Sequence, residues 1–152
     1  MHPQAMPESV AGRHGLLELV ESCFPGDLDA AIELLVERAT MREGGYVCMC
    51  NVHVLTEALR DTRLHDVLRS AAIRFPDGEP VAWLLRRVGS PRARRIGGPD
   101  LFPGVVDRGR VAELRHFLVG TTDANLARLE DALVDSYPGV DVVGKYAPPY
   151  GD

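Results

Sequence analysis

The sequence lacks the features that mark membrane-spanning and secreted proteins. No apolar run approaches the roughly 18–20 residues that a transmembrane helix needs. The first eight residues contain neither the basic segment nor the apolar stretch of a signal peptide. Three cysteines (Cys23, Cys48 and Cys50) are an odd number, which does not suggest a disulfide framework and suits a reducing compartment. We therefore expect a cytoplasmic protein.

Positive charge is scarce and unevenly placed. The formal net charge is −5, and Lys145 is the only lysine among 17 basic residues, so nucleic acid is not an expected partner. Five arginines nevertheless fall within ten positions: Arg86, Arg87, Arg92, Arg94 and Arg95. Because a guanidinium donates two parallel hydrogen bonds, this segment is either a phosphate-binding element or a solvated basic loop.

Familiar cofactor and metal motifs are also absent. The chain has neither a G-x-G-x-x-G nor a G-x-x-x-x-G-K-[ST] pattern, which argues against dinucleotide and P-loop binding. Cys48 and Cys50, followed by His53, do not have the spacing of a structural zinc site. We expect no metal and no cofactor.

The 152 residues, 45% of them hydrophobic, suit one globular domain. Residues 1–15 show no clear hydrophobic period and are expected to form a flexible leader. The domain is expected to span residues 16–152 and to begin with a short apolar turn or strand at 16–20. Strand-length apolar runs lie at 46–50, 71–75, 114–119 and 140–143. Apolar residues recur at helical spacing at 28–39, 54–68 (with a break near 61–62), 81–88, 100–110 and 124–136. Alternating strands and helices predict an α/β layered fold with a mostly parallel sheet flanked by helices.

Ligands of such sheets bind beyond the carboxyl ends of the strands. This rule nominates Asn51, then Asp77 with Gly78, then Gly120 with Thr121 and Thr122. Asp77 is either a general base or an ordinary turn residue. The two threonines either bind phosphate or cap the following helix.

The order of these landmarks resembles the WecG/TagA/CpsF glycosyltransferase family over about residues 28–150. The segments that carry the resemblance are 47–51, Phe75-Pro76-Asp77-Gly78, 95–101, Phe117-Leu118-Val119-Gly120, Tyr137-Pro138-Gly139-Val140 and Val142-Val143-Gly144. Each segment is a weak signal by itself, whereas their ordered combination is specific.

The resemblance implies a Rossmann-like fold and an inverting transfer of a sugar, such as N-acetylmannosamine, from a UDP-sugar to a lipid-linked saccharide at the inner face of the membrane. The products of the family feed teichoic acid, common antigen or exopolysaccharide synthesis. By the same resemblance Asp77 is the base that deprotonates the acceptor, Asn51 lines the pocket and Arg95 meets phosphate. The expected substrate-binding set is Asn51, Gly78, Arg95, Gly98, Asp100, Gly120 and Thr121.

The sequence departs from the family in two ways. Met49 stands where the family usually has threonine, two residues before the asparagine. The family's later Gly-x-Pro-x-Gln-Glu segment and basic appendage are not in this sequence, so we expect a domain incomplete at its C-terminus, with self-association or a complementing chain. Three hypotheses follow: a glycosyltransferase, a non-catalytic binding domain derived from the family, and an unrelated nucleotide-binding domain.

Overall fold

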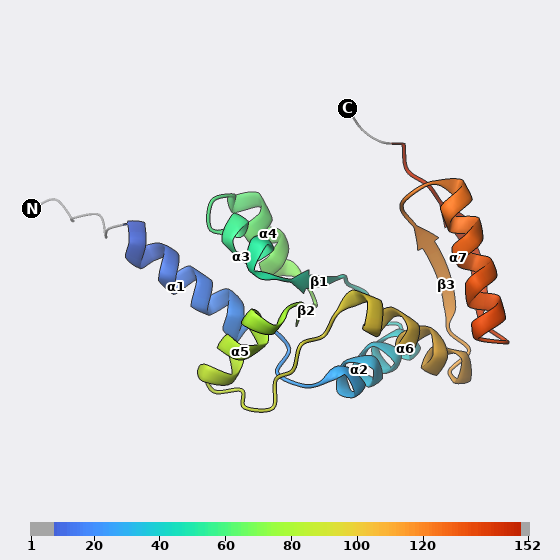
Figure 1. Cartoon of the computed structure of the whole chain (residues 1–152), viewed down its shortest axis with the longest axis horizontal. Coiled ribbons are helices and arrows are strands. Elements are labelled where there is room, and N and C mark those ends of the chain that lie inside the picture. The colour runs from blue at the N-terminus through green and yellow to red at the C-terminus, as the bar shows by residue number, and fades with distance from the viewer. Residues whose placement is uncertain (1–7, 150–152) are drawn as a thin grey trace, which may run out of the picture. The chain divides into compact units, whose positions relative to one another are not determined.

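The computed structural model describes residues 8–149, without the side chains of residues 8–11 and 13 (Figure 1). The chain divides into two compact units. Unit 1 comprises residues 1–31 and 45–101, and unit 2 comprises residues 32–44 and 102–152. Two helices, α2 (Leu28–Thr40) and α6 (Gly98–Val111), begin in unit 1 and continue into unit 2.

Unit 1 is built around one pair of parallel strands. Its elements are α1 (Glu8–Glu21), β1 (Val47–Cys50), α3 (Val52–Ala58), α4 (Thr62–Ser70), β2 (Ile73–Pro76) and α5 (Glu79–Arg87). In the β1–β2 pair Val47 lies opposite Ile73, and Cys50 lies opposite Pro76. Apolar side chains from α1, α3, α4 and α5 form the core of the unit, among them Leu19, Val20, Leu55, Leu68 and Leu85.

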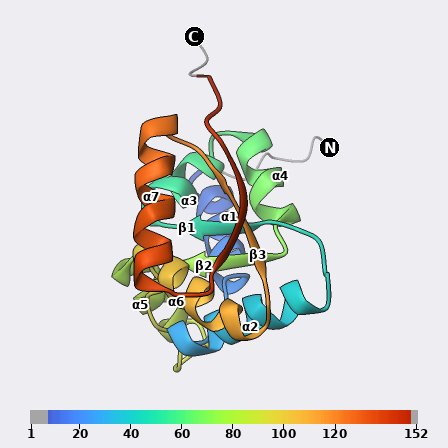
Figure 2. The same ribbon diagram turned by 90° about the vertical axis from the view of Figure 1, so that its right-hand side faces the viewer.

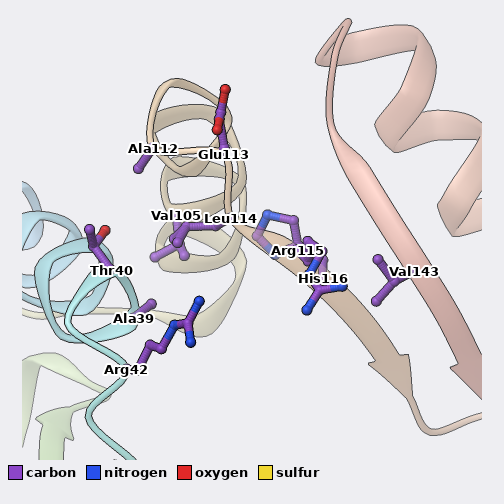
Figure 3. A pocket seen from close by; sticks show the side chains of 10 residues that line it. All are labelled: Ala39, Thr40, Arg42, Val105, Ala112, Glu113, Leu114, Arg115, His116 and Val143. Atoms are coloured by element: carbon purple, nitrogen blue, oxygen red, sulfur yellow. The ribbon is translucent and has the colours of Figure 1, made fainter.

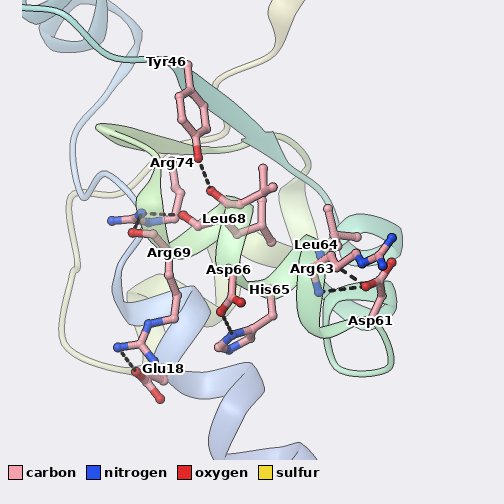
Figure 4. Close-up of polar contacts among 11 residues, drawn as sticks. Glu18, Tyr46, Asp61, Arg63, Leu64, His65, Asp66, Leu68, Arg69 and Arg74 are labelled. Carbon is pink, nitrogen blue, oxygen red and sulfur yellow. Dashed lines mark hydrogen bonds and ion pairs between the residues drawn. The ribbon is translucent and has the colours of Figure 1, made fainter.

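Arg74 and Tyr46 fix the C-terminal end of α4 to the strands (Figure 4). The Arg74 guanidinium donates to the carbonyl oxygens of Leu68 at 2.6 Å and Ala71 at 3.0 Å. The Tyr46 hydroxyl donates to the carbonyl of Val67 at 2.7 Å. Because the last carbonyls of a helix have no partner within the helix, these bonds satisfy groups that would otherwise depend on water.

Helix α1 differs from the expectation for this part of the chain. Residues 16–20 are helical, so the expected turn or strand is wrong; residues 1–7 of the expected leader lie outside the described residues. The helix forms because Leu19 and Val20 bury one of its faces. Gly15 brings this face close to α3, since a Cβ on Gly15 would lie 3.3 Å from Cδ2 of Leu59.

Unit 2 contains the strand–helix–strand expected at the end of the sequence. Strand β3 (Arg115–Val119) leads through α7 (Asp123–Ser136) to β4 (Asp141–Tyr146), and the two strands pair in parallel. Both views show α7 alongside these strands (Figures 1 and 2). Leu126 and Leu133 of α7 form a small core with Leu118 and Val106.

The α/β class is confirmed, since both strand pairs are parallel and helices pack around them. Among the described residues each sheet has two strands, β1–β2 in unit 1 and β3–β4 in unit 2. Within residues 8–149, none of the helices combines the length and the apolarity that crossing a bilayer requires.

Candidate functional site

The carboxyl ends of β1 and β2 bring two of the predicted residues to one edge. The backbone N–H of Asp77 donates to the carbonyl of Cys50 at 2.9 Å, which extends the strand pairing by one residue. Asn51 follows Cys50 directly. Asn51 and Asp77 therefore occupy the edge at which ligands of parallel sheets bind.

Asn51 has a structural role at this edge. It caps the N-terminus of α3, and its side-chain oxygen accepts a 2.9 Å hydrogen bond from the backbone N–H of Val54. Its side-chain NH₂ group has no hydrogen-bond partner within residues 8–149. The half-buried amide can therefore donate to a ligand while its oxygen holds the helix.

Asp77 and Gly78 form the turn from β2 into α5. The Asp77 carboxylate is half-buried and has no hydrogen-bond or ion-pair partner in the described part of the chain. Gly78 has a φ of +136°, a backbone conformation that residues with a side chain rarely adopt. The turn thus presents a carboxylate that is not engaged in holding the fold together.

The arginine-rich loop reaches the same edge through backbone hydrogen bonds. The N–H of Ile96 donates to the carbonyl of Pro76 at 3.0 Å, so Arg95 and Gly97 lie beside the end of β2. Nη1 of Arg95 lies 3.2 Å from Oδ2 of Asp100, and both side chains are about half exposed, at 47% and 52%. The ion pair fixes one side of the Arg95 guanidinium against Asp100, which lies in the first turn of α6.

Gly97 makes this ion pair sterically feasible and was not among the predicted site residues. A Cβ on Gly97 would collide with the guanidinium of Arg95 and would lie 3.1 Å from Oδ2 of Asp100. Gly98, the first residue of α6, has open space where a Cβ would be. The paired glycines after Arg95 were the sequence signal for a close approach of this kind.

Other arginines of the cluster stabilise the protein locally. Arg86 pairs with Glu79 and donates to the carbonyl of Ala93 at 3.2 Å. Arg94 donates to the same carbonyl at 3.0 Å. Arg95 is thus held near a strand end, whereas Arg86 of α5 and Arg94 donate to the backbone of the loop.

The cysteines behind this edge are packing residues. Cys50 is fully buried, and its side-chain hydrogen bond with Cys23, together with burial, raises the pKa of the Cys50 thiol. Burial likewise raises the pKa of Cys48. No group of three or more His, Cys, Asp or Glu side chains suited to a metal ion occurs within residues 8–149. Met49, opposite Phe75 in the sheet, is half-buried.

Gly120 and Thr121 belong to unit 2 and follow β3. Gly120 has a φ of +130°, and its N–H donates to the carbonyl of Tyr146 at 3.0 Å. The Thr121 hydroxyl accepts from the side-chain amide of Asn125 at 2.8 Å, and Thr122 caps α7. The helix-capping interpretation is therefore correct for Thr122.

Six of the eight predicted residues share unit 1: Asn51, Asp77, Gly78, Arg95, Gly98 and Asp100. Backbone hydrogen bonds order them around the ends of β1 and β2. An unpaired carboxylate can accept a proton from a hydroxyl, and a guanidinium can stabilise a phosphate. The chemistry of this edge suits group transfer involving a phosphorylated substrate.

Similarity to known proteins is found both for a family and for an individual relative. The glycosyl transferase WecG/TagA/CpsF family matches residues 22–152. The chain is also similar to the N-acetylglucosaminyldiphosphoundecaprenol N-acetyl-beta-D-mannosaminyltransferase of Bacillus spizizenii, with 28% identity over 102 residues. That alignment covers 67% of this chain and 40% of the relative, so the chain spans about two fifths of the relative's length.

Proposed function

The chain belongs to the WecG/TagA/CpsF glycosyl transferase family, and from this premise we propose that it transfers a sugar of the N-acetylmannosamine type from a UDP-sugar to a lipid-linked saccharide. The name of the Bacillus relative, which specifies an N-acetylmannosaminyl group and a diphosphoundecaprenol acceptor, supports this choice of substrates. The proposed reaction takes place at the inner face of the membrane and supplies cell-surface polysaccharide.

In the proposed mechanism Asp77 accepts the proton of the acceptor hydroxyl. The hydroxyl oxygen then forms a bond to the anomeric carbon on the face opposite UDP. The bond between that carbon and the UDP oxygen breaks, and UDP leaves with the electron pair, so the configuration inverts. The unpaired Asp77 carboxylate at the strand end is the observation that carries this assignment.

Arg95 is proposed to stabilise the negative charge of the diphosphate, because its exposed guanidinium is oriented by Asp100 and retains further donors. The Asn51 amide donates to the substrate while its oxygen caps α3. Gly78 and Gly98 allow the substrate to approach the backbone. Gly120 and Thr121, at the carboxyl end of β3 in unit 2, are proposed to bind substrate by the family resemblance alone.

The test is an assay of the purified chain with UDP-N-acetylmannosamine and a lipid-linked N-acetylglucosamine acceptor, with release of UDP and formation of product both measured. Asp77→Asn should reduce kcat by about 10²–10⁴-fold, the usual contribution of a positioned general base. Glu79→Gln is the matched control, because Glu79 lies two residues away and pairs with Arg86 instead. Equal activity of Asp77→Asn and the native sequence would contradict the role of Asp77.

A non-catalytic binding domain is the second candidate. It is favoured by Met49, which offers a thioether where the family usually has a hydroxyl. This candidate predicts binding of UDP-sugar without turnover at any protein concentration. Turnover that rises more steeply than protein concentration would instead indicate self-association into an active enzyme.

A further inference from the structure

Unit 2 contains a cavity that plays no part in the proposed reaction. Its volume is about 820 Å³, and it is lined by the end of α2, the end of α6 and the start of β3 (Figure 3). Gly120 and Thr121 follow the carboxyl end of β3, whereas the cavity lies at the amino end of the same strand, beside Arg115 and His116. Within unit 2 it is therefore separate from Gly120 and Thr121, the strand-end residues predicted there.

Two arginines at the cavity are not engaged with the protein. Arg42 and Arg115 both line it, and neither side chain has a hydrogen-bond or ion-pair partner among the described residues. Other arginines of unit 2 do pair with carboxylates: Arg38 with Glu43, Arg108 with Glu33, and Arg110 with Asp107. Two free guanidinium groups at one cavity are a binding arrangement for an anion.

The backbone supports this placement of Arg42. Helix α2 ends in a turn in which the N–H of Glu43 donates to the carbonyl of Arg38 at 2.9 Å, with Arg42 at a φ of +57°. This left-handed position usually carries glycine, because a Cβ is disfavoured there. The chain thus places an arginine beside the cavity at a conformational cost.

Glu113 occupies the equivalent position at the end of α6. Its φ is +54°, and the N–H of Leu114 donates to the carbonyl of Gly109 at 3.0 Å. Both helix ends therefore have carbonyl oxygens that are already bonded to backbone N–H groups. Glu113 also lines the cavity, so its lining contains two arginines and one carboxylate.

His116 supplies a polar group that needs a partner. Its Nε2 atom is buried and has no hydrogen-bond partner within the described residues. The atom lies 3.6 Å from the place where a Cβ on Gly109 would be, so the imidazole ring packs close to α6. A buried polar atom of this kind is costly unless a ligand or water meets it.

We propose that this cavity binds a small phosphate ester. Arg42 and Arg115 hold the phosphate, and His116 provides a further hydrogen bond. The volume falls within the range of about 300–1,000 Å³ that is usual for small-molecule sites. Ala39, Val105 and Leu114 give the cavity an apolar wall for the organic part of the ligand, and Thr40 and Glu113 can bind its hydroxyl groups.

Calorimetric titration of the full chain with inorganic pyrophosphate tests the proposal. All measurements use an Arg95→Gln background, so that the proposed catalytic edge does not contribute. Arg42→Gly and Arg115→Gln should each weaken binding at least about tenfold, the effect of losing one charge-assisted hydrogen bond. Glu113→Gly is the matched control, because it relieves the same backbone strain but removes a negative charge; it should bind as tightly as the background or more tightly.

A second arm distinguishes the source of the phosphate. Phosphatidylcholine vesicles that contain phosphatidic acid are tested for cosedimentation, with and without the Arg42→Gly substitution. Cosedimentation that depends on Arg42 identifies a lipid headgroup as the ligand, and pyrophosphate binding without cosedimentation identifies a soluble ester. Circular dichroism confirms that each variant is folded. The proposal is overturned if neither probe binds, or if binding is unchanged in both arginine variants.

Discussion

The backbone N–H of Asp77 donates a 2.9 Å hydrogen bond to the carbonyl oxygen of Cys50, one residue beyond the pairing of β1 with β2. This bond joins the turn that carries Asp77 to the turn that carries Asn51. It involves no side chain of either residue, so substitutions at both positions keep this hydrogen bond. Variants here can therefore separate chemistry from folding.

The double role of Asn51 gives the first prediction. Asn51→Ala removes the cap of α3 and should lower the free energy of unfolding by about 1 kcal/mol. Asn51→Ser keeps a capping oxygen but removes the amide donor, so its stability should stay close to that of the native sequence. If the amide binds the sugar donor, both variants raise its dissociation constant. Urea denaturation and donor titration measure the two effects separately, and unchanged donor affinity in Asn51→Ser would assign Asn51 to capping alone.

The ion pair across Gly97 gives the second prediction. Gly97→Ala places a methyl group against the guanidinium of Arg95, so the pair with Asp100 must shift. Because an exposed ion pair contributes only about 0–1 kcal/mol, the fold should tolerate the change while the dissociation constant of UDP-sugar rises. Gly44→Ala, in a loop with open space around the Cβ, is the control. Equal donor affinity in the two variants would show that the orientation of Arg95 is unimportant.

The sequence predicts local structure well where the signal is itself local. Asp27 marks the start of α2, where its carboxylate accepts from the N–H of Ala30 at 3.0 Å. The break near residues 61–62 is correct because Asp61 caps α4. Helix α1 is not predicted because Gly12 and Gly15 weaken its helical signal. Leu59, the C-cap of α3, lies close to Gly15, and no local pattern reveals this contact.

The candidate site is likewise predictable from the sequence only where the signal is local. Asn51 and Asp77 follow apolar runs, so the rule for strand ends finds them directly. The Arg95–Asp100 pair and its dependence on Gly97 require the geometry of the turn into α6. The cavity beside Arg42 and Arg115 brings together positions more than seventy residues apart, and nothing in the local sequence of either residue connects them.

His116 predicts a dependence of stability on pH. Burial lowers its pKa, and this effect outweighs the opposing effect of Asp141. The unfolded chain, with a histidine pKa of about 6.5, then binds more protons than the folded chain, so the free energy of unfolding should fall as pH drops below that value. Urea denaturation at about pH 5 and about pH 8 should show a smaller difference for His116→Gln than for the native sequence. The exposed His14 provides the control, His14→Gln, and an equal loss of pH dependence in both variants would contradict the assignment to His116.

Gly104 lets α6 approach α2 within unit 2, and this contact gives the last prediction. A Cβ on Gly104 would collide with Cδ1 of Ile32 and lie 3.0 Å from its Cγ1. Alanine gains about 1 kcal/mol of helix propensity over glycine, but overpacking a core position costs about 1–3 kcal/mol. Ile32 is buried and cannot withdraw without losing contacts, so Gly104→Ala should be destabilising in urea denaturation.

Gly12→Ala in α1 isolates the propensity effect, because no atom lies within 4 Å of its Cβ position; this variant should be stabilising. Ile32→Val removes Cδ1, the atom that collides. The double variant should therefore be more stable than the sum of the two single changes implies, since the cavity left by one change accommodates the methyl group of the other. Strict additivity would mean that α6 and α2 can separate at this point without cost, and that the glycine is not required for their contact.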